Sequence, residues 1–369
     1  MEIKISKSKA LFLGILLGLG LIWLAYLGNP KNMALCTACF IRDQVGALNM
    51  HQSAGTMYFR PEIVGILVGA LALGLATGTK ARAASAPGLR FLGGIILMVN
   101  SLVFLGCTLR MVLRLASGDL SAIVGLVGFV LGVFVGVHFI KKGFTLGQAN
   151  VAPAQINIWV IPMISVLFLL LSWVTPQLFN WSKAGPGSFH ATPIIALIVG
   201  LVFGAIAFAT RLCFVGSVRD IILIRDFTLI TPIIGLFVVM LIYNIMTGDF
   251  NIVAFGPIAH NQHLWNVLSM FAVGFAGVLF GGCPVRQVVL AGSGHGNAIM
   301  TFMGMVFGAA LAHNFSLASA PSVAATAEAA AVSGGPGLNG QIFVIGSIVF
   351  LFALAYYVVN KRADIVAEA

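Results

Sequence analysis

The sequence has 369 residues, of which 60% are hydrophobic and only 8% are charged. About a quarter of the residues of a soluble globular domain are charged, so this composition excludes that class of protein. The formal net charge of +10 calls for no nucleic-acid partner, because an uneven distribution of basic residues across a membrane accounts for most of it.

Apolar windows long enough to cross a bilayer, roughly 17 to 25 residues each, recur along the whole chain. No small-residue cleavage site clearly follows the first window, so we expect it to stay as a helix and not to be a signal peptide. The pattern predicts an all-α polytopic membrane protein with about ten transmembrane helices in a lipid bilayer. The windows are 10–28, 62–78, 89–105, 121–140, 156–174, 191–210, 228–246, 263–281, 297–314 and 341–359.

Basic residues gather on one side of these predicted helices. Lys4, Lys7 and Lys9 precede the first window, and Lys361 and Arg362 follow the last. The connections on that same side contain Lys80, Arg82, Arg90, Lys141, Lys142 and Arg225. Outside the motifs described below, the opposite side has only Lys31, Arg60 and Lys183. The positive-inside rule then places both termini in the cytoplasm.

Two pairs of stretches indicate an internal duplication. "GCTLRMVLRLASGDLSAIVGLVGFVLG" (106–132) matches "GCPVRQVVLAGSGHGNAIMTFMGMVFG" (282–308) at 11 of 27 positions without a gap. "LCTACFIRD" (35–43) matches "LCFVGSVRD" (212–220) at nearly the same offset. We therefore expect two copies, each made of four spans and two Cys-containing segments.

The predicted copies cover 10–142 and 190–316. The single span 156–174 links them and turns the second copy upside down, as in the inverted repeats of many secondary transporters. The span 341–359 is an extra C-terminal helix outside the repeat. Irregular backbone at membrane depth is tolerated where it lines a cavity or is buried in protein, so the four Cys-containing segments are predicted to be short re-entrant half-helices meeting near the midplane.

Four of the five cysteines open these segments, namely Cys36, Cys107, Cys213 and Cys283. A lone buried cysteine is usually a packing residue. Packing alone, however, would not be expected to place a cysteine at the start of every one of these segments. The start of a half-helix offers free N–H groups and the positive end of the helix dipole, which suits a small anion. We therefore predict an anion path lined by these cysteines.

Other residues of the predicted path flank the cysteines. Gly106 and Gly282 precede Cys107 and Cys283 and allow close approach of a ligand. Arg110 and Arg286 follow three residues later, on the same helix face, and either contact the anion or reach to the membrane interface. Arg42 and Arg219 are expected either to pair with the neighbouring Asp43 and Asp220 or to be interfacial. Arg114 is expected to be a charge flanking a span, and Glu62 to be interfacial.

The duplicated Cys-bearing segments, with "GCPVRQ" and "ALCTACFIRD", resemble the YeeE/YedE family of bacterial membrane proteins, the sulphur-transport group. The sequence is most similar to the selenium-linked YedE branch. The resemblance implies uptake of a small sulphur oxyanion such as thiosulfate, or of a selenium compound, across the bacterial inner membrane. It also implies that Cys36, Cys107 and Cys283 pass the substrate along by S–H hydrogen bonds, with the part of Cys213 left open, and that a cytosolic TusA-like (YedF-type) sulfur carrier is the partner.

The leading hypothesis is therefore a transporter or facilitator, and not an enzyme. No Gly-rich phosphate loop with Lys-Ser/Thr is present, and we expect no metal and no cofactor. Cys36 and Cys39 form a C-x-x-C pair, so a membrane thiol-redox protein is one alternative. A membrane docking partner of a cytosolic sulfur-carrier protein is the other.

Overall fold

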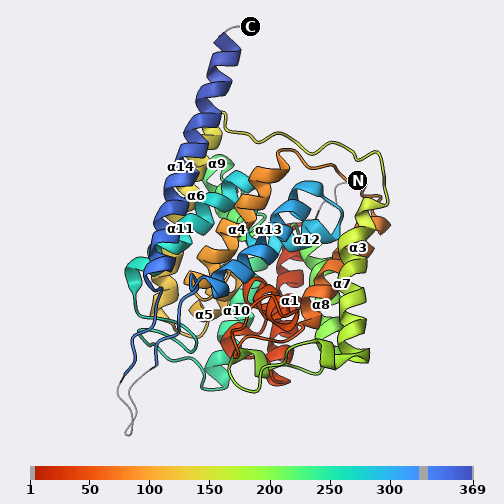
Figure 1. The fold of residues 1–369 in the computed structure, drawn as a ribbon, viewed down its shortest axis with the longest axis vertical. Helices are drawn as coiled ribbons and strands as arrows, with labels where there is room; N and C mark the ends of the chain where they lie inside the picture. The colour runs from red at the N-terminus through yellow and green to blue at the C-terminus, as the bar shows by residue number, and fades with distance from the viewer. Residues whose placement is uncertain (1–4, 324–330, 368–369) are drawn as a thin grey trace.

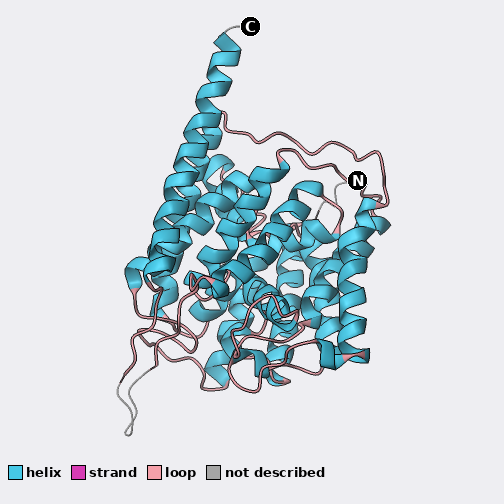
Figure 2. Ribbon diagram, in the orientation of Figure 1, coloured by secondary structure: helices cyan, strands magenta, loops and turns pink. Residues whose placement is uncertain are grey.

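The structure is a computed structural model that describes residues 5–323 and 331–367. Within these residues the regular structure is helical and no β-strand is formed (Figure 2). By length and composition, eight helical segments are apolar enough to cross a membrane, and two shorter apolar helices accompany them. The prediction of an all-α polytopic membrane protein is confirmed.

Ten helices coincide with the ten apolar windows of the sequence. They are α1 (Lys7–Tyr26), α3 (Pro61–Ala76), α4 (Pro87–Val103), α6 (Leu120–Lys141), α7 (Asn157–Val174), α8 (Pro193–Ala209), α10 (Thr231–Met246), α11 (His263–Phe280), α13 (Gly296–Asn314) and α14 (Leu338–Ala367). Three 3-10 turns, η1 (Lys31–Met33), η2 (Pro176–Leu178) and η3 (Pro186–Ser188), lie in connections.

Four shorter helices begin directly after a cysteine. They are α2 (Thr37–Ala47), α5 (Thr108–Leu115), α9 (Phe214–Ile224) and α12 (Pro284–Gly292). In each of them the cysteine is the N-cap residue and has an extended backbone. Pro284 is in the first turn of α12, where its missing N–H costs nothing.

The long helices pack mainly in four pairs: α3 with α8, α1 with α10, α6 with α11, and α4 with α13. Glycines lie at these crossings. Because glycine has no side chain, it allows the backbones of the two helices to approach closely. A Cβ added at Gly132 of α6 would overlap the Phe271 carbonyl oxygen of α11. One added at Gly94 of α4 would overlap the Thr301 carbonyl oxygen of α13.

Gly132→Ala is therefore expected to destabilise the protein by roughly 1–3 kcal/mol, the usual cost of overpacking a well-packed contact. The obstacle is the backbone of α11, which cannot rotate away as a side chain can. Gly346→Ala in α14 is the matched control, because a Cβ there meets nothing within 4 Å. Thermal unfolding of the detergent-purified variants measures the difference, and equal melting temperatures would contradict the close crossing.

The connections lie on two opposite faces. On one face the 77–86 connection is hydrogen-bonded to 293–295 and to 142–156, for example from Arg82 N to Gly294 O (3.0 Å) and from Ala83 N to Asn150 O (2.8 Å). Figure 1 shows that α14 extends toward this face, which we call the C-terminal face. The connections 27–36, 48–60, 175–192 and 247–262 form the opposite face, where Asn180 N donates to Ala47 O (2.9 Å).

Candidate anion path

Three cysteines form the first thiol cluster, Cys36, Cys39 and Cys107, and all three are fully buried. The Cys36 Sγ lies 2.9 Å from Cys39 Sγ and 3.7 Å from Cys107 Sγ. The Thr37 hydroxyl donates to Cys107 Sγ at 3.3 Å. The cluster is thus made of free thiols in mutual contact.

The remaining two cysteines, Cys213 and Cys283, form the second thiol cluster. Both are buried, free thiols, and their side chains are hydrogen-bonded to each other. The Cys213 Sγ also accepts the Gly216 N–H at 3.1 Å. All four cysteines that the sequence places on the path are therefore brought together in two pairs, Cys36 with Cys107 and Cys213 with Cys283.

Each cluster lies where two helices begin. Cys36 and Cys107 cap α2 and α5, and Cys213 and Cys283 cap α9 and α12. The starts of two helices thus converge on each group of thiols, and each start contributes free N–H groups and the positive end of a dipole. In addition, α12 contacts both α2 and α5, so the two clusters stand on helices that touch. A site made of helix starts and thiols favours an anion with a soft atom that accepts weak hydrogen bonds from the thiols.

The glycines before Cys107 and Cys283 make room for the arginine stems. A Cβ added at Gly106 would stand 2.8 Å from Arg110 Cδ, and one at Gly282 would stand 2.8 Å from Arg286 Cγ. This space was predicted to allow close approach of a ligand. The structure fills it with the arginine three residues further on, so that each glycine serves to hold its arginine against the start of the helix.

Arg110 is fully buried and bonds to main-chain carbonyls rather than to a carboxylate. Its Nη2 donates to the Pro257 and Ile258 carbonyl oxygens at 3.3 and 3.1 Å, and its Nε donates to Asn32 O at 3.3 Å. Its Nη1 donates to Leu105 O and lies 3.8 Å from Cys39 Sγ. The guanidinium therefore joins the first thiol cluster to the loop around Pro257.

That loop, residues 254–260, is here called the 254–260 segment. Asn32 Nδ2 donates to Pro257 O at 2.5 Å, and Ser322 N donates to Ala259 O at 2.8 Å. His260 is buried, which lowers its pKa to about 4, and its neutral ring donates from Nε2 to Val103 O at 2.9 Å. Ile258 has a φ of 55°, an unusual conformation for a β-branched residue. The segment is thus tied down at several points.

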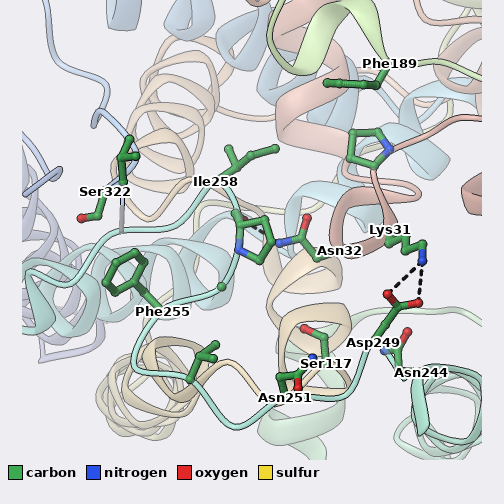
Figure 3. Close-up of a pocket in the computed structure, with 15 residues that line it drawn as sticks. Lys31, Asn32, Ser117, Phe189, Asn244, Asp249, Asn251, Phe255, Ile258 and Ser322 are labelled. Atoms are coloured by element: carbon green, nitrogen blue, oxygen red, sulfur yellow. Dashed lines mark hydrogen bonds and ion pairs between the residues drawn. The ribbon is translucent and has the colours of Figure 1, made fainter. Parts of the chain in front are cut away.

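On the opposite face, the 254–260 segment borders a cavity of about 950 Å³. Figure 3 shows Phe255 and Ile258 on one wall and the Lys31–Asp249 ion pair, 2.6 Å between Nζ and Oδ2, on another. The hydrogen bond from Lys31 lowers the pKa of Asp249, and the same bond raises the pKa of Lys31. The segment and Arg110 therefore lie between this cavity and the first thiol cluster.

Comparison with known protein families decides the assignment for the C-terminal part of the chain. Residues 209–369 match the sulphur transport family. The matched part contains the second thiol cluster with Gly282 and Arg286, while the first cluster lies before it. The family resemblance drawn from the sequence is thereby confirmed for residues 209–369. No curated protein matches the chain.

Two expectations about charged residues are confirmed. Arg42 Nη2 lies 2.6 Å from Asp43 Oδ1, and Arg219 Nη2 lies 2.7 Å from Asp220 Oδ1. Asp43 is also paired with Arg60, at 2.8 Å. These arginines are engaged by neighbouring carboxylates, as their adjacency in the sequence indicated.

One expectation about a charged residue was wrong, and Glu62 has a partner that was not expected. Arg114 is fully buried and paired with Asp119, with 2.7 Å between Nε and Oδ2, and is not a flanking charge. Glu62 is fully buried at the start of α3 and accepts from Asn29 Nδ2 at 2.8 Å. Both side chains gain tertiary partners that hydropathy does not reveal.

Thr37 and Asn32 were missed by the sequence analysis. Thr37 follows Cys36 directly, so its place beside the cluster was readable from the chain. In the second copy the matching residue is Phe214, and this difference was the available signal. The contact of Asn32 with Pro257 joins residues 225 positions apart, and no sequence pattern pointed to it.

Proposed function

We propose that the protein carries a small sulfur-containing oxyanion, thiosulfate or a close selenium analogue, across the membrane. In this proposal the anion passes the first thiol cluster and then the second. Thiols donate weak hydrogen bonds to its terminal chalcogen, and the helix starts and arginines stabilise its charge. The cysteines act protonated, because thiolates would repel an anion.

One observation carries this proposal: the two thiol clusters are built alike. Each has a Cys–Cys contact at the start of two helices, with a glycine before one cysteine and an arginine three residues after it. Packing cysteines would have no reason to repeat this arrangement. The match of residues 209–369 to the sulphur transport family supports transport over catalysis.

The packing of the helices supports an inverted repeat. In the proposed copies α1, α3, α4 and α6 correspond to α8, α10, α11 and α13. The pair of α3 with α8 then has its counterpart in the pair of α10 with α1, and α6 with α11 has its counterpart in α13 with α4. Such reciprocal contacts are expected of two copies related by a two-fold axis. The boundaries proposed for the copies remain 10–142 and 190–316.

We further propose that the protein is in a bacterial inner membrane with both termini in the cytoplasm. The C-terminal face then faces the cytoplasm, which is supported by its basic connections. A TusA-like carrier is the proposed recipient of the sulfur or selenium on that face.

Uptake of radiolabelled thiosulfate, and separately of selenosulfate, in which selenium replaces the terminal sulfur, by cells that lack their own uptake routes tests this function. We expect the wild-type protein to support uptake of one of them and Cys107→Ala or Cys283→Ala to abolish it. Each of these cysteines is buried in one cluster and contacts its partner thiol there. Membrane levels of the variants must match the wild type.

Uptake that survives both changes would make the cysteines packing residues and reject the thiol path. Sulfate is the matched control substrate, because it has the charge of thiosulfate but no terminal sulfur for the thiols to bind. It is expected to give no uptake.

The 2.9 Å contact between Cys36 and Cys39 favours a thiol-redox protein as the second candidate function. Closing that disulfide releases two protons and two electrons, so it needs a two-electron acceptor such as a quinone. Cys39→Ser separates the candidates: uptake should be largely retained if the protein transports through the path, and redox cycling should be lost if it is an oxidoreductase.

A further inference from the structure

A second cavity lies on the C-terminal face, beside the start of α12. It has a volume of about 310 Å³, room for a small anion with some of its waters at about 30 Å³ per water. Basic side chains dominate its lining, and the described lining residues include no carboxylate. The basic ones are Lys80, Arg82, Arg211, Arg286 and His295. Positive charge collected in a concave site attracts anions.

Arg286 lines this cavity, and one of its guanidinium nitrogens is free to donate a further hydrogen bond to a ligand. Its Nη1 atom is buried and has no hydrogen-bond partner among the residues that the structure describes, and the same holds for His295 Nδ1. A buried guanidinium nitrogen without a partner costs free energy unless a ligand or water supplies the acceptor. The equivalent Arg110 differs, because its donors are occupied by the carbonyls of Pro257, Ile258 and others.

Loop length explains this difference between the two arginines. The connection that leads to α11 and the connection that leads to α4 are each held by an isolated parallel β-bridge. Val253 bridges to Asp119, which follows α5, and Arg82 bridges to His295, which follows α12. From there nine residues, 254–262, lead to α11, whereas four residues, 83–86, lead to α4. The longer connection covers Arg110 with carbonyl oxygens. The shorter one leaves Arg286 facing a cavity.

The cavity also adjoins the second thiol cluster. A Cβ at Gly282 would stand 2.8 Å from Arg286 Cγ and 3.7 Å from Cys213 Sγ, so Gly282 lies close to both the arginine stem and the thiol. An anion leaving the thiols on this side therefore meets the guanidinium next.

We propose that this cavity is an anion site that binds a divalent oxyanion on its way out to the C-terminal face. The inference rests on the proposed transport function and adds a site that recognises charge and oxygen atoms. Because no thiol lines the cavity, the site accepts sulfate as well as thiosulfate. The thiol clusters alone distinguish the two anions.

The test is equilibrium binding of radiolabelled sulfate to the full-length protein in phosphatidylcholine nanodiscs. We expect Arg286→Gln to weaken binding about tenfold or more, since a charge-assisted hydrogen bond is lost. Lys80→Gln and Arg82→Gln should each weaken it a few-fold and in a salt-dependent way. Lys142→Gln is the control, because this exposed basic residue of the same face does not line the cavity.

Cys283→Ala separates this inference from the proposed function. If the cavity is the site, this variant still binds sulfate, and thiosulfate displaces it. Equal sulfate affinity in wild type and Arg286→Gln would overturn the site, even if thiosulfate uptake still depends on Cys283. Arg286-dependent binding without any uptake would keep the site and reject transport. Sulfate binding abolished by added anionic lipid would overturn it too, since the cavity would then hold a lipid headgroup.

Discussion

Asp119→Asn is expected to lower the free energy of unfolding by about 3–5 kcal/mol, because it leaves a buried arginine without its counter-charge. Arg114 is enclosed by Asp119 (2.7 Å), Phe104 O (3.0 Å), Ser121 Oγ (2.5 Å) and the Phe104 ring (4.3 Å to its centroid). Asp119 also accepts the Ser121 N–H at 2.9 Å as the N-cap of α6. The variant thus weakens both the ion pair and the start of a long helix.

Denaturant titration of the protein in mixed micelles, followed by tryptophan fluorescence, measures this effect. Asp249→Asn is the control, since its pair with Lys31 is partly exposed and such pairs contribute about 0–1 kcal/mol. The double variant Arg114→Met/Asp119→Asn should be more stable than the sum of the single changes predicts, because no unpaired charge remains. Strict additivity, or an Asp119→Asn loss below 1 kcal/mol, would show that the pair is not a stabilising contact.

Much of the fold was predictable because the membrane imposes simple requirements on a sequence. Helices of bilayer length satisfy every backbone hydrogen bond internally, so apolar windows translate directly into helices. The match of 106–132 with 282–308 located the short helices as well, and the cysteines at their starts became N-caps.

The tertiary partners of charged residues were not predictable in the same way. Arg114 and Asp119 lie five residues apart in the sequence, but the matching residues of the second copy are Leu290 and His295, so the duplication gave no support for a pair. The contrast between Arg110 and Arg286 arises from connections that lie outside the matching stretches. Where loop length differs between copies, equivalent side chains acquire different partners.

Arg110→Gln is expected to expose the first thiol cluster to water-soluble thiol reagents. The arginine holds the 254–260 segment through the Pro257 and Ile258 carbonyls, and Asn32 adds a third bond at 2.5 Å. Hydrogen bonds from a charged donor contribute about 1.5–3 kcal/mol each. Their loss should therefore raise the fraction of molecules in which the 254–260 segment is open, and with it the labelling rate, tenfold or more. Asn32→Ala removes only one of these bonds and should give a smaller rise.

Labelling is measured in nanodiscs with a charged methanethiosulfonate, in a Cys213→Ser/Cys283→Ser background so that only the first cluster reacts. Lys31→Gln is the control, because Lys31 lines the same cavity but bonds Asp249 and not the segment. Removing a positive charge beside a thiol disfavours the reactive thiolate. Faster labelling of Arg110→Gln would therefore report access and not reactivity. An unchanged rate would mean that the 254–260 segment does not close the path, and entry to the first cluster would have to be sought elsewhere.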